Sequence, residues 1–83
     1  MIQIARTPKQ LGETLRRYRT LAGLNQSQVA ARAGLRQATI SQIEGGSEAT
    51  KIETVYSVMA ALDLEMTIAP RSKSSSQDIE DIF

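Results

Sequence analysis

The stretch LNQSQVAARAGLRQATISQIEGG, residues 24–46, decides the fold of this chain. Asn25 suits the N-cap of a helix, and Gln28, three positions later, suits the reciprocal bond of a capping box. Gly34 suits the left-handed backbone with which a helix commonly ends. A further short helix is predicted at about 37–44, before a pair of glycines. The stretch therefore indicates two short helices joined by a tight turn.

Small and apolar side chains in this stretch indicate how the two helices pack. Ala30 lies where the helices would cross, and a small side chain lets them approach closely. Ile40 and Ile43, three residues apart, share one face of the second helix and would be buried against Val29. These positions together predict a helix-turn-helix.

The opposite face of the second helix carries the short neutral side chains of Gln37, Ala38, Ser41 and Gln42. A face exposed only to water would commonly carry Glu and Lys. Gln suits bidentate contact with adenine, Ala suits the thymine methyl group, and Ser pairs with either kind of base edge. We therefore predict that these four residues read bases in DNA. The alternative is an ordinary small helical bundle in which this helix happens to be uncharged.

A helix is predicted at about 8–22, before the helix-turn-helix. Thr7 would be its N-cap, Pro8 its first residue, and Gln10 the partner of Thr7 in a capping box. Gly23 follows, where a helix often ends with positive φ. The apolar face of this helix would consist of Leu11, Leu15, Tyr18, Leu21 and Ala22.

A fourth helix is predicted from about residue 50. Thr50 and Glu53 have the spacing of a capping box. The chain is therefore expected to be all-α, with four or five helices. The apolar face of the fourth helix would consist of Ile52, Val55, Met59 and Leu62.

Residues 64–69 alternate apolar and polar side chains, which is the period of a strand, and Pro70 ends the pattern. A single strand cannot satisfy its own backbone groups. Residues 2–4 are a weak candidate for a partner. Pairing with the same strand of a second copy is simpler and predicts a homodimer. The residues expected in this dimer strand are Leu64, Met66, Thr67 and Ile68.

The charged residues divide unevenly between the two halves of the chain. Residues 1–41 carry seven basic residues and one acidic residue, whereas residues 42–83 carry three basic and eight acidic residues. A basic half indicates a surface that faces a polyanion, although chance clustering of solvated charges gives the same balance. The basic candidates for phosphate contacts are Arg6, Lys9, Arg16, Arg17, Arg32 and Lys51.

The composition argues against several classes of function. The chain has no cysteine and no histidine, so it lacks thiolate metal ligands, disulfides and the commonest general base. Its carboxylates are scattered, without a glycine-rich phosphate loop or an activated nucleophile. We therefore expect no enzyme activity, no cofactor and no metal site. No apolar stretch is long enough to span a membrane, so the expected location is the cytoplasm, in association with the nucleoid.

We expect an N-terminal arm at 1–6, a DNA-binding and dimerisation domain at 7–69, and a flexible tail at 70–83. The end of the tail combines acidic residues with three apolar ones, Ile79, Ile82 and Phe83. Two interpretations stay open. The tail is either solvated and without a role, or it anchors Phe83 in the pocket of a partner or recruits a protease.

The span from Leu11 to Leu64, and above all LNQSQVAARAGLRQATISQIEGG, resembles the lambda-repressor/Cro-type helix-turn-helix family. The resemblance implies that the predicted base-reading residues have that role. It also implies that Gln26 contacts a phosphate and supports Gln37. Arg36 and Thr39 would lie against the DNA backbone, with base contact as an alternative for Arg36.

The same family implies a role for a pair of charged residues. Arg19 and Glu44 occupy positions that often form an ion pair between the first helix and the end of the third. A phosphate contact is the alternative for Arg19.

Three further stretches, TPKQL, RQATIS and ALDLEMTIAP, resemble the HipB-type antitoxins. This resemblance implies a dimeric, sequence-specific repressor that regulates its own operon and neutralises a HipA-type Ser/Thr kinase toxin. It also implies that the strand after the fourth helix closes the dimer in a two-chain sheet. Two alternatives are a stand-alone or phage-type repressor without a toxin, and an interaction module that uses the DNA-binding fold only as a scaffold.

Overall fold

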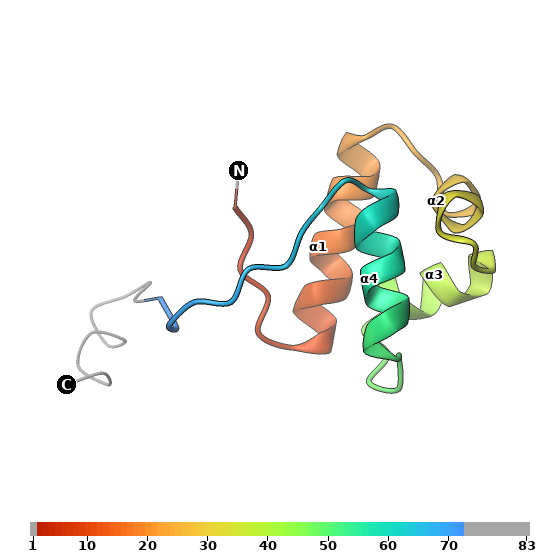
Figure 1. Ribbon diagram of the computed structural model, residues 1–83. Coiled ribbons are helices and arrows are strands. Elements are labelled where there is room, and N and C mark those ends of the chain that lie inside the picture. The colour runs from red at the N-terminus through yellow and green to blue at the C-terminus, as the bar shows by residue number, and fades with distance from the viewer. Residues whose placement is uncertain (1, 73–83) are drawn as a thin grey trace.

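Residues 2–72 are described by the structure, which is a computed structural model. They form four α-helices, namely α1 (Pro8–Leu21), α2 (Gln26–Ala33), α3 (Gln37–Glu44) and α4 (Ile52–Ala61). α2 and α3 lie together on one side of α1 and α4, and residues 2–6 and 64–72 extend on the opposite side (Figure 1). The expected all-α bundle is confirmed, with four helices. None of these helices is long and apolar enough to cross a membrane.

The N-caps of α1 and α2 are those that the sequence predicts. The Thr7 hydroxyl accepts a hydrogen bond from the Gln10 backbone N–H at 3.0 Å. Asn25 and Gln28 form the full capping box, with both reciprocal bonds at 2.8 Å. The reciprocal bond expected between Gln10 and Thr7 is wrong, because the Gln10 side chain accepts from the Arg6 N–H instead, at 2.7 Å. This bond fixes the arm, residues 2–6, to the first turn of α1.

The start of α4 differs from the prediction. The helix begins at Ile52, and its N-cap is Lys51, whose side chain makes no capping bond. The capping box between Thr50 and Glu53 is therefore wrong, because Thr50 precedes the N-cap position by one residue. Ile52 was expected on the buried face but is 59% exposed, since the first residue of α4 lies beyond the edge of the core.

The core joins all four helices. Leu21 was expected on the buried face of α1, yet it is 64% exposed. It follows Leu15 by six residues, and six steps of about 100° turn it away from the core. Ala22, the C-cap of α1, is exposed as well. The buried residues are Leu15, Val29, Ala30, Ile40, Ile43, Val55, Val58 and Met59.

A close backbone contact joins α1 to the end of α3. Gly12 is buried in the middle of α1. A Cβ atom at this position would overlap the carbonyl oxygen of Ile43 and would lie 2.8 Å from that of Glu44. Only a residue without a side chain allows α1 to approach α3 this closely. This contact is absent from the predictions above, although a glycine inside a helix is a known signal of close packing.

The C-terminal segment, residues 62–72, leaves the bundle beside the arm. Asp63 has φ of 58°, and the Leu64 N–H closes the end of α4 on the Met59 carbonyl at 2.8 Å. No strand is formed within residues 2–72. The strand at 64–69 stays a prediction, because its expected partner is a second chain. Arg6 Nη2 donates to the Ser72 carbonyl and hydroxyl at 3.1 and 3.2 Å, so the arm holds the end of this segment.

Candidate nucleic-acid interface

α3 has one buried face and one exposed face, as its sequence predicts. Ile40 and Ile43 point into the core, where Ile40 is only 1% exposed. The four predicted base-reading residues lie on the outer face, and all of them are exposed. The structure therefore presents a continuous neutral surface on the outside of α3 formed by Gln37, Ala38, Ser41 and Gln42.

The turn between α2 and α3 fixes the angle at which this surface is presented. Gly34 ends α2 with φ of 71°, the left-handed conformation that only glycine adopts without strain. The Leu35 N–H then bonds to the Ala30 carbonyl at 2.9 Å. Ala30 is buried at the crossing of the two helices, where the small side chain permits close approach. Sequence and structure agree at every position of this turn.

A chain of hydrogen bonds connects α1 to the beginning of α3. Arg19 Nε and Nη2 donate to the Glu44 carboxylate at 2.6 and 3.0 Å, and Arg19 Nη1 donates to the Leu24 carbonyl at 2.9 Å. The Gln26 amide donates to the same carboxylate at 3.0 Å. The Gln26 carbonyl oxygen accepts from the Gln37 amide. The ion pair between Arg19 and Glu44 and the support of Gln37 by Gln26 are thus both present.

The charges in this network hold each other in the ionised state. Burial alone would raise the pKa of Glu44, but hydrogen bonds from Arg19 and Gln26, with the positive charges of Arg19 and Arg16, outweigh it and lower the pKa. The hydrogen bond to Glu44 raises the pKa of Arg19 against the effect of burial. Glu44 is therefore a stable anion, and its geometry sets the orientation of the Gln26 amide.

The predicted phosphate contacts occupy different parts of the surface. Gln26 lies at the start of α2, already joined to Gln37. Arg36 is the exposed N-cap of α3 without a side-chain capping bond, and Thr39, half-buried, lies in the first turn of that helix. These three residues surround the beginning of α3. Two others are exposed farther along the chain, Arg32 in the last turn of α2 and Lys51 at the start of α4.

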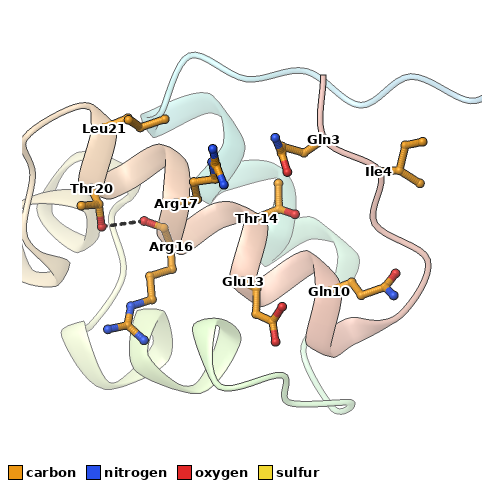
Figure 2. A pocket seen from close by; sticks show the side chains of 9 residues that line it. All are labelled: Gln3, Ile4, Gln10, Glu13, Thr14, Arg16, Arg17, Thr20 and Leu21. Carbon is orange, nitrogen blue, oxygen red and sulfur yellow. Dashed lines mark hydrogen bonds between the residues drawn. The ribbon is translucent and has the colours of Figure 1, made fainter. Parts of the chain in front are cut away.

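Arg16 and Arg17 leave α1 on opposite sides (Figure 2). Arg16 extends toward α3, and its charge contributes to the lowered pKa of Glu44. Arg17 lies on the side of α1 that faces Gln3 of the arm. Of these two candidates, the structure places Arg16 nearer α3.

The residues predicted for the dimer strand lie away from α3, on the side of the bundle from which the C-terminal segment extends (Figure 1). Leu64 packs against the core, whereas Ile68 is 91% exposed. Met66 accepts a bond from the Tyr56 hydroxyl, which lies 3.7 Å from its sulfur atom. The tail residues Ile79, Ile82 and Phe83 lie outside the described residues. Within the described part of the chain, no group of three or more side chains could hold a metal ion.

These features define a DNA-binding protein of the helix-turn-helix class: a buried inner face, a glycine turn and a supported polar outer face on the second helix of the motif. A family model described as a helix-turn-helix domain matches residues 10–67. The chain is 31% identical to the antitoxin HipB of Escherichia coli strain K12 over 74 residues, which cover 89% of this chain and 84% of HipB. The chain belongs to the HipB antitoxin family.

Solved structures agree with this assignment. A chain in a HipA–HipB complex with the operators O2 and O3 superimposes with a TM-score of 0.79 at 31% identity, covering 86% of this chain and all of the other. HipB in complex with a 20mer of operator O4 gives a TM-score of 0.80 at 31% identity, over the same shares. The restriction-modification controller protein C.AhdI of Aeromonas hydrophila is more distant, with a TM-score of 0.66 at 29% identity, covering 70% of this chain and 88% of the controller.

Proposed function

We propose that this chain binds operator DNA as a homodimer, represses its own operon in the cytoplasm and acts as the antitoxin of a HipA-type Ser/Thr kinase. The observation that carries the DNA-binding part is the hydrogen-bonded support of Gln37 by Gln26 and Glu44. A side chain held in one orientation loses less entropy when it binds a base edge. The solved complexes of HipB with operator DNA and with HipA support the assignment of both partners.

In this proposal, Gln37, Ala38, Ser41 and Gln42 read bases in the major groove. Their exposure on one face of a helix fits direct readout of base edges. The residues around the beginning of α3 contact phosphates and fix the register of the helix on the duplex. The proposed phosphate contacts are Gln26, Arg36 and Thr39. Further electrostatic contributors are Arg32, Lys51 and one of the two α1 arginines, Arg16 or Arg17.

The dimer of this proposal pairs residues 64–69 of two chains. The segment leaves the bundle on the side away from α3, so two copies joined there present their recognition helices outward (Figure 1). Recognition helices of such dimers enter successive major grooves about 34 Å apart, or a multiple of this. The residues proposed for the two-chain sheet are Leu64, Met66, Thr67 and Ile68.

The DNA-binding proposal is tested by fluorescence anisotropy with the DNA upstream of the gene. We expect Gln37→Ala to weaken binding by about 1–3 kcal/mol and to relax the preference at one base pair. Gln3→Ala, a matched control on the arm, should bind normally. An equal loss on every DNA sequence would argue against base reading by Gln37.

The antitoxin proposal needs a separate test. The tagged chain is expressed in its own host, and the proteins that copurify with it are identified. Recovery of a kinase-like protein in equal amount, together with growth arrest when that protein is expressed alone, supports the proposal. Recovery of operator DNA without a protein partner would favour a stand-alone repressor. If a kinase is recovered, removal of residues 78–83 tests whether Ile79, Ile82 and Phe83 contribute to that contact.

A further inference from the structure

A shallow groove follows the exposed side of α1, from Gln10 to Leu21. The arm forms one wall, and the outer side of α1 forms the other. Ile4 lies at one end and Leu21 at the other, with Thr14 and Arg17 between them (Figure 2). Ile4 is 55% exposed and Leu21 is 64% exposed, so this groove, called the α1 groove below, offers two apolar side chains to a ligand.

The charges at the α1 groove favour an acidic ligand. Arg16 and Arg17 line it, and Glu13 is the one acidic residue of its lining. A ligand that combines carboxylates with apolar side chains would satisfy both properties of this surface.

The chain itself contains such a ligand. Its last six residues, DIEDIF, carry three acidic side chains together with Ile79, Ile82 and Phe83. Hydrogen bonds from Arg6 hold Ser72, the last described residue, beside the arm. Arg6 is two residues from Ile4 along the chain. Residues 73–77 can span about 17 Å when extended, which allows Asp78 to reach a groove whose wall is the arm itself.

We propose that residues 78–83 dock into the α1 groove of their own chain. Their apolar side chains contact Ile4 and Leu21, and their carboxylates lie beside Arg17, which is on the same side of α1 as the arm. Docking within one chain is favoured over docking between chains because the short connection gives the segment a high local concentration. A protein that binds the tail through Phe83 must then compete with α1 for it.

The test uses the absence of cysteine from the natural sequence. Ser76→Cys gives a single attachment site for a nitroxide, and NMR measures the broadening of backbone amides in the full chain. Docking predicts that the amides of Thr14, Arg17 and Leu21 lose most of their intensity, while those of Ser41 and Gln42 keep theirs. The broadening should disappear in a chain with Ile79→Ser, Ile82→Ser and Phe83→Ser, which retains the tether and the acidic residues.

Two further variants and a mixing experiment complete the test. Leu21→Ser, at an exposed position, should weaken the broadening, whereas Ile52→Ser, at a similarly exposed isoleucine of α4, should leave it unchanged. Broadening that persists in the triple serine variant would reflect the tether alone and would overturn the proposal. In a mixture of isotope-labelled chains with separate nitroxide-carrying chains, the amides of Thr14, Arg17 and Leu21 should lose much less intensity than in chains that carry their own nitroxide. An equal loss in the mixture would identify the tail of a second copy as the ligand and would overturn docking within one chain.

Discussion

Arg19 in the last turn of α1 and Glu44 at the end of α3 are joined by two hydrogen bonds, of 2.6 and 3.0 Å, across 25 residues of sequence. The bidentate contact fixes the plane of the carboxylate as well as its position. Gln26 binds that carboxylate and also Gln37. The ion pair therefore determines how α1, the start of α2 and the recognition helix are placed relative to one another.

Removal of the charge of Glu44 should destabilise the protein. We expect Glu44→Gln to lower the free energy of unfolding by about 2–3 kcal/mol, because Arg19 keeps a largely buried charge without its counter-ion. Urea unfolding followed by circular dichroism measures this change. Glu48→Gln, at an exposed position in the loop before α4, is the matched control and should have little effect. Equal stability of the two variants would show that the ion pair contributes nothing net.

The lowered pKa of Glu44 predicts a dependence of stability on pH. A carboxylate with a pKa lower in the folded than in the unfolded chain stabilises the fold fully above its unfolded pKa, about 4.3. This stabilisation is lost as the pH falls through the lower, folded pKa. The Tm is measured at a series of pH values from neutral downward. As the pH falls, the Tm of the natural chain should decrease more steeply than that of Glu44→Gln. Parallel curves would contradict the shift.

Gly12 should not tolerate a side chain. Alanine is the better helix former by about 1 kcal/mol, yet we expect Gly12→Ala to destabilise by about 1–3 kcal/mol. The added methyl group would overlap the Ile43 carbonyl and force α1 away from α3. Glu13→Ala, at the exposed neighbouring position, should change the free energy of unfolding little. A stabilised Gly12→Ala protein would mean that the two helices are free to separate.

Asp63 is a site where a substitution should stabilise the chain. Its φ of 58° is unfavourable for a residue with a side chain, and its carboxylate lies at the negative end of α4. We expect Asp63→Gly to raise stability by about 1 kcal/mol, measured as a higher Tm. Glu65→Gly, two residues later in the extended segment, should lower the Tm, because glycine only increases the freedom of the unfolded chain there.

The two neighbouring arginines of α1 should differ in their effect on DNA binding. Arg16 extends toward α3, whereas Arg17 lies on the side of the arm (Figure 2). If only Arg16 reaches a phosphate, Arg16→Ala should reduce the slope of log affinity against log salt by about 1, and Arg17→Ala should leave it unchanged. Anisotropy titrations at several salt concentrations measure both slopes. A larger change for Arg17→Ala would assign the phosphate contact to that residue.

Features fixed by neighbouring residues were predictable from the sequence. Asn25 and Gln28 form a capping box by themselves, and Gly34 ends α2 because few other residues adopt its conformation easily. The inner and outer faces of α3 follow from helical spacing alone. The link between Arg19 and Glu44 required the resemblance to a known family, since nothing local connects residues so far apart.

Features that depend on packing between distant segments were missed or wrong. The contact of Gly12 with Ile43 depends on the angle between α1 and α3, which no local pattern gives. Thr50 and Glu53 have the spacing of a capping box, but the path of the loop makes Lys51 the N-cap. Ile52 is an apolar residue at the beginning of α4, where the core no longer covers it.

α3 and the C-terminal segment lie on opposite sides of the bundle (Figure 1). A protein bound to that segment leaves α3 uncovered, so DNA and protein need not exclude each other. A chain that binds DNA through α3 and a protein through the C-terminal segment holds that protein at the operator. A partner held in this way is concentrated at the operator even when it has no affinity of its own for DNA.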